Sequence, residues 1–303
     1  MHTQRTQHSE HDQQVTARRT VTRVDERIDL GADAQVDSKA IFFPPTAPEL
    51  TDPFLLLSDD VFSSPGFDWH PHRGLETVTM VVDGVLEHGD SLGNAGALST
   101  GDVQWMTAGR GIIHRELAFR NERAHTLQLW VNLPTDKKMT DTRYQDLRVV
   151  ERPVITGEGI RIDLIAGSSG DVAGPALTHW PISAAVLTLE PGRALEHVLP
   201  AADRAFFAVL AGTLTIAGRT VQAGQTAWSD PAGDSGLSTI DLHATDGGRP
   251  AQVMTFSGPP TRQPVVFGGP FVMNHKSEIA KAFADFHAGK FGDIPRQARL
   301  KYR

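Results

Sequence analysis

Short runs of alternating hydrophobic and polar residues recur along the chain, separated by turns rich in glycine and asparagine. Residues 77–82 and 102–106 are two such runs, and the segments 83–84 and 92–96 between them are turn-like. In a strand, residues i and i+2 point to the same face, so this alternation indicates strands with one buried face. Strands joined by such turns are typical of antiparallel hairpins.

A second set of strand-like runs begins near residue 149. It covers residues 160–167, 185–189, 206–210 and 212–218. The glycine at position 212 lies in a hairpin-like segment that resembles the segment around the glycine at position 84. Two sets of strands with a shared landmark indicate an internal duplication of one β unit.

Near the C-terminus the hydrophobic spacing changes from period two to that of a helix. The residues at i, i+3, i+4 and i+7 form one apolar stripe: Ile279, Ala282, Phe283 and Phe286. Asn274 or Ser277 can cap the start of this helix, and Gly289 can end it. We expect the stripe to dock on one of the β units.

These patterns divide the chain into four parts. Residues 1–18 are polar and are expected to be a disordered extension. Residues 19–148 form the first β domain and residues 149–270 the second. Residues 271–303 supply the helix and a tail that pack on the β domains.

Composition narrows the class of protein. The chain has 303 residues, 40% of them hydrophobic and 21% charged, which suits two globular domains. A formal charge of −7 argues against direct contact with nucleic acid. There is no cysteine, so disulfides and thiolate chemistry are excluded. No apolar run is long enough to cross a bilayer, and no signal peptide is recognised, so we expect a cytoplasmic protein.

Two pairs of potential metal ligands stand out, and in each pair one residue separates the two side chains. They are His70 with His72, and His114 with Glu116. If each pair lies in a strand, each aims two side chains the same way. A single strand histidine is usually a surface or hydrogen-bonded residue, but two such pairs in one hairpin array favour a metal site. Imidazole and carboxylate ligands suit Fe, Mn, Ni, Cu or Zn.

Three further residues near these pairs leave alternatives open. Glu76 follows His72 by four positions and is either a structural or supporting partner, which we favour, or a ligand. His88 and Asp90 alternate on an expected strand, and we interpret them as a hydrogen-bonded pair that supports the barrel rather than as a second metal site. Near the end of the first domain, Lys137 and Lys138 are expected on a solvated face.

The second β unit lacks a comparable set of residues. Glu196, His197 and His243 could in principle gather, but no two-histidine alternating pair occurs there. We therefore expect the second unit to be structural, or to serve as a surface for a partner.

Four long motifs in this order resemble the pirin family. They are residues 70–79, residues 101–112 followed by His114 and Glu116, residues 127–134, and residues 269–274. The resemblance spans residues 21 to 292. It implies an all-β fold of two tandem cupin (jelly-roll) barrels with a short C-terminal helix. It also implies a metal, usually iron, in the first barrel only, held by His70, His72, His114 and Glu116.

The resemblance implies a function as well. Some pirins are described as quercetin 2,3-dioxygenases, which open a flavonol ring with O2 and release carbon monoxide. A flavonol-like or related chelating aromatic substrate would bind beside the Fe(II), with Glu116 acting as ligand and local base. Phe67 and Trp69 are candidates for the pocket wall, whereas Phe54, Met80 and Trp105 are expected in the barrel core.

The same resemblance supports a different class of function. Related eukaryotic proteins act as nuclear cofactors that bind transcription regulators, and some bacterial relatives bind metabolic enzymes. The iron would then be a redox sensor that changes affinity for a regulatory protein partner. A metal-dependent isomerase or hydrolase is a third possibility, because a fold does not fix a function. The family suggests a monomer.

Overall fold

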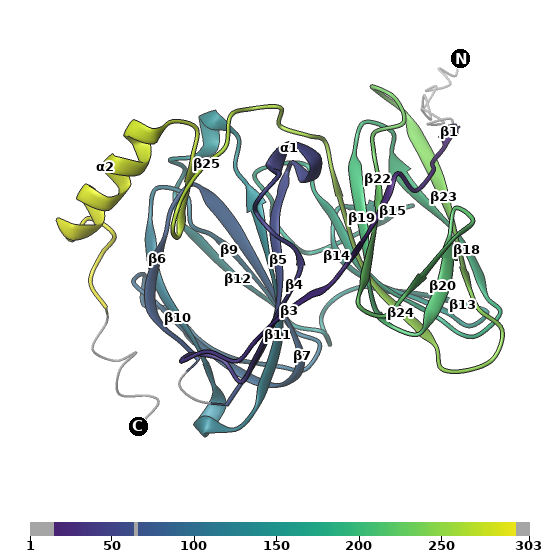
Figure 1. The fold of residues 1–303 in the computed structure, drawn as a ribbon, viewed down its shortest axis with the longest axis horizontal. Coiled ribbons are helices and arrows are strands. Elements are labelled where there is room, and N and C mark those ends of the chain that lie inside the picture. The colour runs from purple at the N-terminus through teal and green to yellow at the C-terminus, as the bar shows by residue number, and fades with distance from the viewer. Residues whose placement is uncertain (1–14, 64–65, 295–303) are drawn as a thin grey trace, which may run out of the picture.

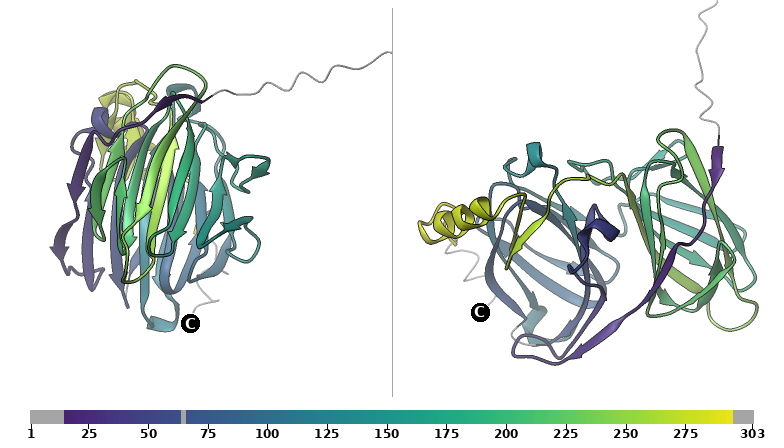
Figure 2. Two further views of the ribbon diagram at one scale, coloured as in Figure 1. Left: turned by 90° about the vertical axis from the view of Figure 1, so that its right-hand side faces the viewer. Right: turned by 45° about the horizontal axis from the view of Figure 1, so that its top comes forward.

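The computed structural model describes residues 15–63 and 66–294. Figures 1 and 2 show two β-barrels side by side, with helix α2 on the side of the first barrel that faces away from the second. Strands dominate both halves of the described chain, so the all-β prediction with one short C-terminal helix is confirmed.

The first barrel is built mainly on one large sheet in the order β12-β9-β7-β11-β5-β4-β3, with β10 paired to both β6 and β7, and β8 paired to β7. Helix α1 (Pro48–Thr51) and two 3-10 turns (Phe119–Asn121 and Thr135–Lys137) lie in its connections. Its strands are β3 (Ile28–Gly31), β4 (Ser38–Phe43), β5 (Phe54–Phe62), β6 (Phe67–His72), β7 (Leu75–Asp90), β8 (Ala95–Ser99), β9 (Val103–Thr107), β10 (Ile112–Ala118), β11 (Ala124–Asn132) and β12 (Arg143–Leu147).

The second barrel has two main sheets, in the orders β13-β14-β17-β24-β19-β22-β2 and β1-β23-β20-β21, with β18 paired to β23. A two-stranded ribbon of β15 (Ser168–Ser169) and β16 (Val172–Ala173) accompanies them. The strands are β13 (Val154–Gly157), β14 (Ile160–Ala166), β17 (Ser183–Leu189), β18 (Ala194–Pro200), β19 (Arg204–Ala211), β20 (Thr213–Ile216), β21 (Arg219–Gln222), β22 (Gln225–Ser229), β23 (Leu237–Ala244) and β24 (Ala251–Gly258).

The ends of the described chain are exchanged between the barrels. Strands β1 (Val15–Arg18) and β2 (Arg23–Glu26) pair with β23 and β22 of the second barrel. The hairpin of β25 (Val266–Gly268) and β26 (Phe271–Met273) returns to the first barrel, where Phe271 bridges to Arg73. Figure 1 shows β1 beside β23 and α2 at the opposite end of the molecule.

The expected domain boundaries therefore need correction. Residues 15–18 form a strand rather than part of a disordered extension, and residues 1–14 lie outside the described residues. Residues 19–26 continue with the second barrel, not the first. The boundary at residue 270 divides the β25–β26 hairpin. Alternation along a sequence indicates a strand, but it does not indicate which strand it will pair with.

The expected turn at residues 83–84 is absent, because β7 continues through it. Gly84 instead marks where β7 passes from pairing with β11 to pairing with β8 and β10. Its φ is +84°, and a Cβ there would lie 2.0 Å from the Arg123 carbonyl oxygen. Gly212 has a φ of +74° and separates β19 from β20 in the same way. Both positions require glycine for this change of sheet.

A continuous hydrophobic core joins the two barrels. It includes side chains from both, with all four of the following rings almost fully buried. Phe54 packs edge-on against Phe206 with ring centroids 5.0 Å apart, and Trp105 lies 6.3 Å from Phe256. The barrels therefore meet sheet against sheet, and their relative position is held by apolar packing.

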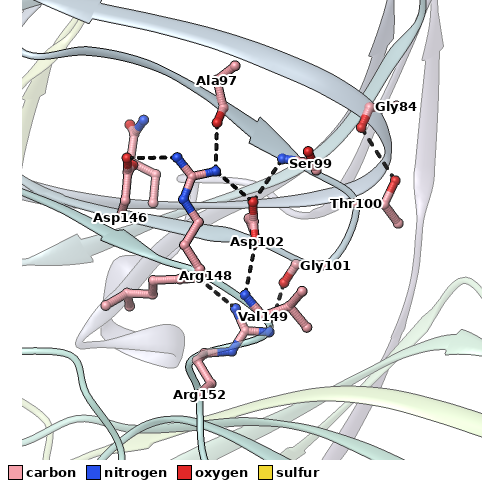
Figure 3. A network of polar contacts seen from close by, with 12 residues as sticks. Gly84, Ala97, Ser99, Thr100, Gly101, Asp102, Asp146, Arg148, Val149 and Arg152 are labelled. Carbon is pink, nitrogen blue, oxygen red and sulfur yellow. Dashed lines mark hydrogen bonds and ion pairs between the residues drawn. The ribbon is translucent and has the colours of Figure 1, made fainter.

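Arginines fix the linker between the barrels (Figure 3). Arg148 donates to Asp102 at 2.9 Å, next to the turn between β8 and β9. Arg152 donates to the Gly101 carbonyl at 2.7 Å and pairs with Asp163 of β14 at 2.8 Å. The Arg152–Asp163 pair is buried, and through the Gly101 carbonyl the same guanidinium also holds the first barrel, so Arg152 sets the direction of the chain as it leaves β12.

Helix α2 (Lys276–His287) confirms the expected helix and corrects its cap. His275, rather than Asn274 or Ser277, is the N-cap residue, and the Glu278 carboxylate accepts its backbone N–H at 2.9 Å. The helix ends before Gly289, which has a φ of +72°. Ala282 is fully buried, and the stripe packs on Phe271 and Phe291. No helix within the described ranges has both the length and the hydropathy to span a membrane.

Candidate metal centre

Two neighbouring strands of the first barrel carry the two predicted ligand pairs. β6 bears His70 and His72, and β10 bears His114 and Glu116. The strands are antiparallel, with His114 directly opposite His70. The register shifts between His114 and Glu116, where two steps along β10 oppose the three from His70 to Phe67, which indicates a bulge in β6.

The structure brings the three histidines together. The ring centroids of His70 and His114 are 4.3 Å apart, and each lies 5.0 Å from that of His72. One potential ligand atom from each of the three lies within 4.8 Å of the others, and no other such group of three or more occurs among the described residues. Side chains 44 residues apart in sequence are thus placed to hold one ion.

Hydrogen bonds orient two of the rings. His70 Nδ1 lies 2.7 Å from the carbonyl oxygen of Asp68, and His72 Nδ1 lies 3.1 Å from that of Pro270. Donation from Nδ1 leaves Nε2 of each ring with a free lone pair. Backbone carbonyls therefore accept both of these bonds.

Burial keeps the histidines neutral. His72 is 2% exposed and His114 is fully buried. Burial, together with the neighbouring imidazole, lowers the pKa of His72 to about 3, and it lowers the pKa of His114 well below the usual value. Burial also lowers the pKa of His70. His72 Nε2 and both ring nitrogens of His114 have no hydrogen-bond partner within the described structure. Buried nitrogens without a proton or partner suit a metal ion.

Glu116 is held by two donors on neighbouring strands. Thr79 Oγ1 donates to Glu116 Oε1 at 2.9 Å, and Gln128 Nε2 donates to Glu116 Oε2 at 2.6 Å. Trp130 Nε1 donates to Gln128 Oε1 at 3.2 Å, which fixes the orientation of that amide. Glu116 lies outside the 4.8 Å group of imidazole atoms. Its carboxylate keeps further lone pairs for an ion or a substrate proton.

Sequence reasoning missed the polar interior around Glu116. Thr79 and Gln128 stand opposite each other on β7 and β11, within runs interpreted as ordinary barrel strands. Asp60 of β5 is 3% exposed, and burial raises its pKa to about 6. Ser58 donates to it at 2.8 Å. Polar residues at inward positions of these strands were the available signal, because a barrel interior is normally apolar.

Glu76 takes the structural role that we favoured. It is fully buried and accepts a hydrogen bond from Thr107 Oγ1 at 2.6 Å. It is absent from the histidine group. The alternating neighbours of Glu76 on β7, Val78 and Met80, belong to the core shared by the two barrels, so this face of the strand is turned away from the histidines.

His88 and Asp90 lie close together, as expected, but not at hydrogen-bond distance. His88 Nε2 is 3.6 Å from Asp90 Oδ2, and both side chains are fully buried. Asp90 accepts from the backbone N–H of Leu92 and from the Asn94 side chain, which shapes the turn after β7. The His88 ring stacks on Tyr144 with centroids 4.5 Å apart, and it lies 5.5 Å from His114.

The five aromatic and apolar residues considered for the pocket wall or the barrel core lie where they were expected. Phe54, Trp105 and Met80 are buried in the core between the barrels. Phe67 is partly buried, with its ring centroid 6.4 Å from that of His70. Trp69 is also partly buried and lies under the guanidinium of Arg115 at 5.1 Å.

Lys138 corrects the expectation of a solvated face. Its side chain is 2% exposed and donates to the Gly74 carbonyl, the Val272 carbonyl and Asn132 Oδ1 at 2.6 to 2.9 Å. Lys137 remains half-exposed. Because Gly74 follows the first ligand pair, Lys138 ties that segment to the hairpin from the C-terminal end of the chain.

In the second barrel, Glu196 and His197 lie on β18, and His243 lies on β23. His243 stands opposite Ala194, three residues from His197 along the strand. These residues do not form a ligand group within the described ranges.

The chain is similar to known proteins over most of its length. The family described as Pirin matches residues 22–131, and the Pirin C-terminal cupin domain matches residues 184–292. Pirin-1 of Arabidopsis thaliana is 38% identical over 246 residues, which cover 80% of this chain and 85% of that protein. Pirin of Homo sapiens is 37% identical over 253 residues, covering 81% and 85%. A crystal structure of quercetin 2,3-dioxygenase from Acinetobacter baumannii is 31% identical, with a TM-score of 0.81, covering 92% and 100%.

Proposed function

The chain belongs to the pirin family, and from this premise we propose that its first barrel is a metal-dependent oxygenase of the quercetin 2,3-dioxygenase type. The proposed ligands are His70, His72, His114 and Glu116. The observation that carries the proposal is the group of three imidazoles, in which His72 Nε2 and both ring nitrogens of His114 are buried without a hydrogen-bond partner among the described residues. The Acinetobacter structure named for this activity adds support.

A metal ion bound there would supply Lewis acidity and, if it is iron, one-electron chemistry towards O2. The residues of the chain supply the rest. The Asp68 and Pro270 carbonyls hold the rings of His70 and His72, so the Nε2 lone pair of each ring would be available to a metal ion. Glu116 is an acceptor because both of its oxygens receive hydrogen bonds. A remaining lone pair can take the proton of a substrate hydroxyl.

The proposed substrate is a flavonol or a related aromatic molecule with adjacent oxygens. Phe67 and Trp69 are the proposed apolar contacts on the open side of the site, because both are only partly buried. His70 lies on this side, whereas His72 and His114 are enclosed. We place Fe(II) first among the metals, ahead of Mn, Ni, Cu and Zn, and propose a cytoplasmic monomer.

The test is O2 uptake with quercetin by untagged protein after loading with Fe(II), Mn(II), Ni(II), Cu(II) or Zn(II) in turn. We expect turnover with iron and none with zinc, which has no redox chemistry. His72→Ala should abolish metal binding and turnover. His243→Ala, an exposed histidine on the second barrel, is the matched control. Iron-loaded protein that leaves quercetin unchanged would exclude this substrate.

A second candidate function is a redox-dependent regulator, which one observation favours. Asp68 is exposed and lies two residues from His70, and its carbonyl accepts that ring's N–H. A change of one charge on the metal would therefore act on a surface segment directly. Hydrogen exchange of residues 66–70 should differ between the Fe(II) and Fe(III) forms. Identical exchange in the two forms would count against this role.

A further inference from the structure

The two barrels can be superposed in register by their strand pairing alone. Gly84 and Gly212 mark the same change of sheet. Two residues beyond Gly84, Leu86 pairs with Ala118 of β10. Two residues beyond Gly212, Leu214 pairs with Ala244 of β23. These pairs fix the equivalence of β10 with β23, and β18 pairs with β23 as β6 pairs with β10.

This register shows what replaces each proposed metal ligand in the second barrel. Two residues before Ala244 is Leu242, and two residues before that is Ile240. Ile240 pairs with His197 on β18, just as His114 pairs with His70 on β6. The four equivalent positions are therefore Leu242 for Glu116, Ile240 for His114, Leu199 for His72, and His197 for His70. Three polar positions have become apolar, and one imidazole is retained.

A cavity of about 530 Å³ lies where this imidazole sits. Its wall includes Ile162, Leu164, Ala185, His197, Thr255 and Ser257. Thr255 pairs with Phe207, which lies five positions before Gly212. In the first barrel, Gln128 pairs with Thr79, which lies five positions before Gly84. The cavity thus occupies the interior position that the polar residues around Glu116 occupy in the first barrel. Its volume is within the range of small-molecule sites.

Two hydroxyl groups of this cavity, those of Ser257 and Thr255, are committed as donors. Ser257 Oγ donates to Asp203 at 2.8 Å, and Thr255 Oγ1 donates to the Phe206 carbonyl at 3.0 Å. Each hydroxyl therefore offers lone pairs to a ligand. Burial lowers the pKa of His197 to about 4, so its ring is neutral and can accept a hydrogen bond at one nitrogen or donate one from the other. The rest of the wall is mostly apolar, but it also carries the hydroxyl groups of Ser168, Ser169 and Ser183 and the carboxylate of Glu196.

We propose that the second barrel is a metal-free binding site for an uncharged, mainly apolar molecule of one or two rings that carries a hydroxyl group. The hydroxyl donates to His197, and the rings lie on Ile162, Leu164 and Ala185. A charged ligand is disfavoured, because it would lose its hydration without a free countercharge: the Glu196 carboxylate in the wall already pairs with Arg18 at 3.4 Å. The nearby Arg19 already donates to the Pro200 and Asp230 carbonyls, and Asp203 is bound to Ser257. This site is independent of the proposed oxygenase activity.

The test uses the full chain after removal of metal with a chelator. The probe is 2-naphthol, titrated by its fluorescence, with 2-methoxynaphthalene as the analogue that lacks the donor proton. We expect 2-naphthol to bind about tenfold more tightly than the analogue, the effect of one hydrogen bond to a buried acceptor. His197→Leu should weaken 2-naphthol binding about tenfold, and His243→Leu, on an exposed position of β23, should not.

Three results would overturn the proposal. They are equal binding by the His197→Leu and His243→Leu proteins, equal binding of probe and analogue, and loss of binding in His114→Ala, which would place the probe in the first barrel. Thermal unfolding of each variant shows whether it is folded. If His197→Leu does not fold, His197→Gln, which keeps a hydrogen-bonding group, should retain binding. Because no metal is present, failure here leaves the oxygen-uptake result unaffected.

Discussion

At the scale of single residues, the candidate metal centre depends on groups that hold the ligands rather than on the ligands alone. Two of the three rings donate to backbone carbonyls, and the Pro270 carbonyl comes from the far end of the chain. Glu116 depends instead on two side chains, Thr79 and Gln128. These side-chain hydrogen bonds can be removed by substitution, whereas bonds to backbone carbonyls cannot. The contribution of supporting groups to metal binding can therefore be tested at Glu116.

Gln128→Leu should lower metal affinity about tenfold, because a carboxylate that loses its supporting donor is less well oriented. Gln128 is the right residue to change, since Trp130 fixes its amide so that the N–H group faces Glu116. Affinity is measured with Co(II), whose visible spectrum also reports ligand geometry, in competition with a chelator. Gln252→Leu, an exposed position on β24, is the control. Equal affinities in the two variants would contradict the role of Gln128.

Glu76→Gln should stabilise the protein at neutral pH. Burial raises the pKa of Glu76 to about 6 from a usual value near 4.5, so the folded state binds this proton more tightly than the unfolded state. The contribution of Glu76 to stability therefore falls as pH rises from 4.5 to above 6. Removing the charge should raise the free energy of unfolding relative to wild type by up to about 2 kcal/mol across that window. Urea unfolding at several pH values measures it; a difference independent of pH would refute the assignment.

At the scale of elements, the segment around the first ligand pair is held from three directions. β10 pairs with β6, the β25–β26 hairpin contacts Arg73, and Lys138 reaches both Gly74 and Val272. Arg73 also forms a buried ion pair with Asp285 of α2 at 2.9 Å. The C-terminal elements are therefore part of the support of the first barrel, although they follow the second barrel in sequence.

Lys138→Met should destabilise the protein by roughly 3 kcal/mol, because it leaves three buried acceptors without their donor. The adjacent Lys137→Met is a matched control, since Lys137 is half-exposed and pairs only with Asp136. That change should stay within about 0.5 kcal/mol. Urea denaturation followed by tryptophan fluorescence gives both values. A similar loss for the two variants would show that the buried hydrogen bonds of Lys138 are not the cause.

At the scale of the whole molecule, the barrels are joined by an apolar interface and by the exchange of chain ends. Phe206 of the second barrel contacts Phe43 and Phe54 of the first, with ring centroids 5.2 and 5.0 Å away. Strand β2 pairs with β22, while α2 packs on the first barrel. Neither barrel is complete from a continuous piece of chain, so we expect the two to unfold together.

Phe206→Ala should lower stability by about 4 kcal/mol and weaken the coupling between the barrels. In calorimetry, wild type should unfold in one transition and this variant in two. The control is Phe207→Ala, whose ring belongs to the separate core of the second barrel, so its loss should not split the transition by uncoupling the interface. A single transition at the wild-type temperature for Phe206→Ala would contradict the expected coupling.

The local features of this protein can be derived from its amino-acid sequence alone. Alternation at 77–82 and 102–106 indicated strands, and the spacing at 279–286 indicated a helix, because the period of hydrophobic residues reflects which side faces a core. The pairs at 70/72 and 114/116 indicated the histidine group for the same reason. The motifs were specific enough to identify the family.

Which distant segments meet depends instead on how the whole chain folds. Nothing local distinguishes Lys138 from the half-exposed Lys137, because the acceptors of Lys138 come from β11, the segment after β6, and β26. The role of Gln128 likewise depends on a distant residue, Glu116. Strands β1 and β2 pair with strands of the second barrel, far along the chain. The equivalence of His197 to His70 is visible only from the strand register. Sequence periodicity specifies the face that a residue occupies, whereas its partner is set by how the whole chain packs.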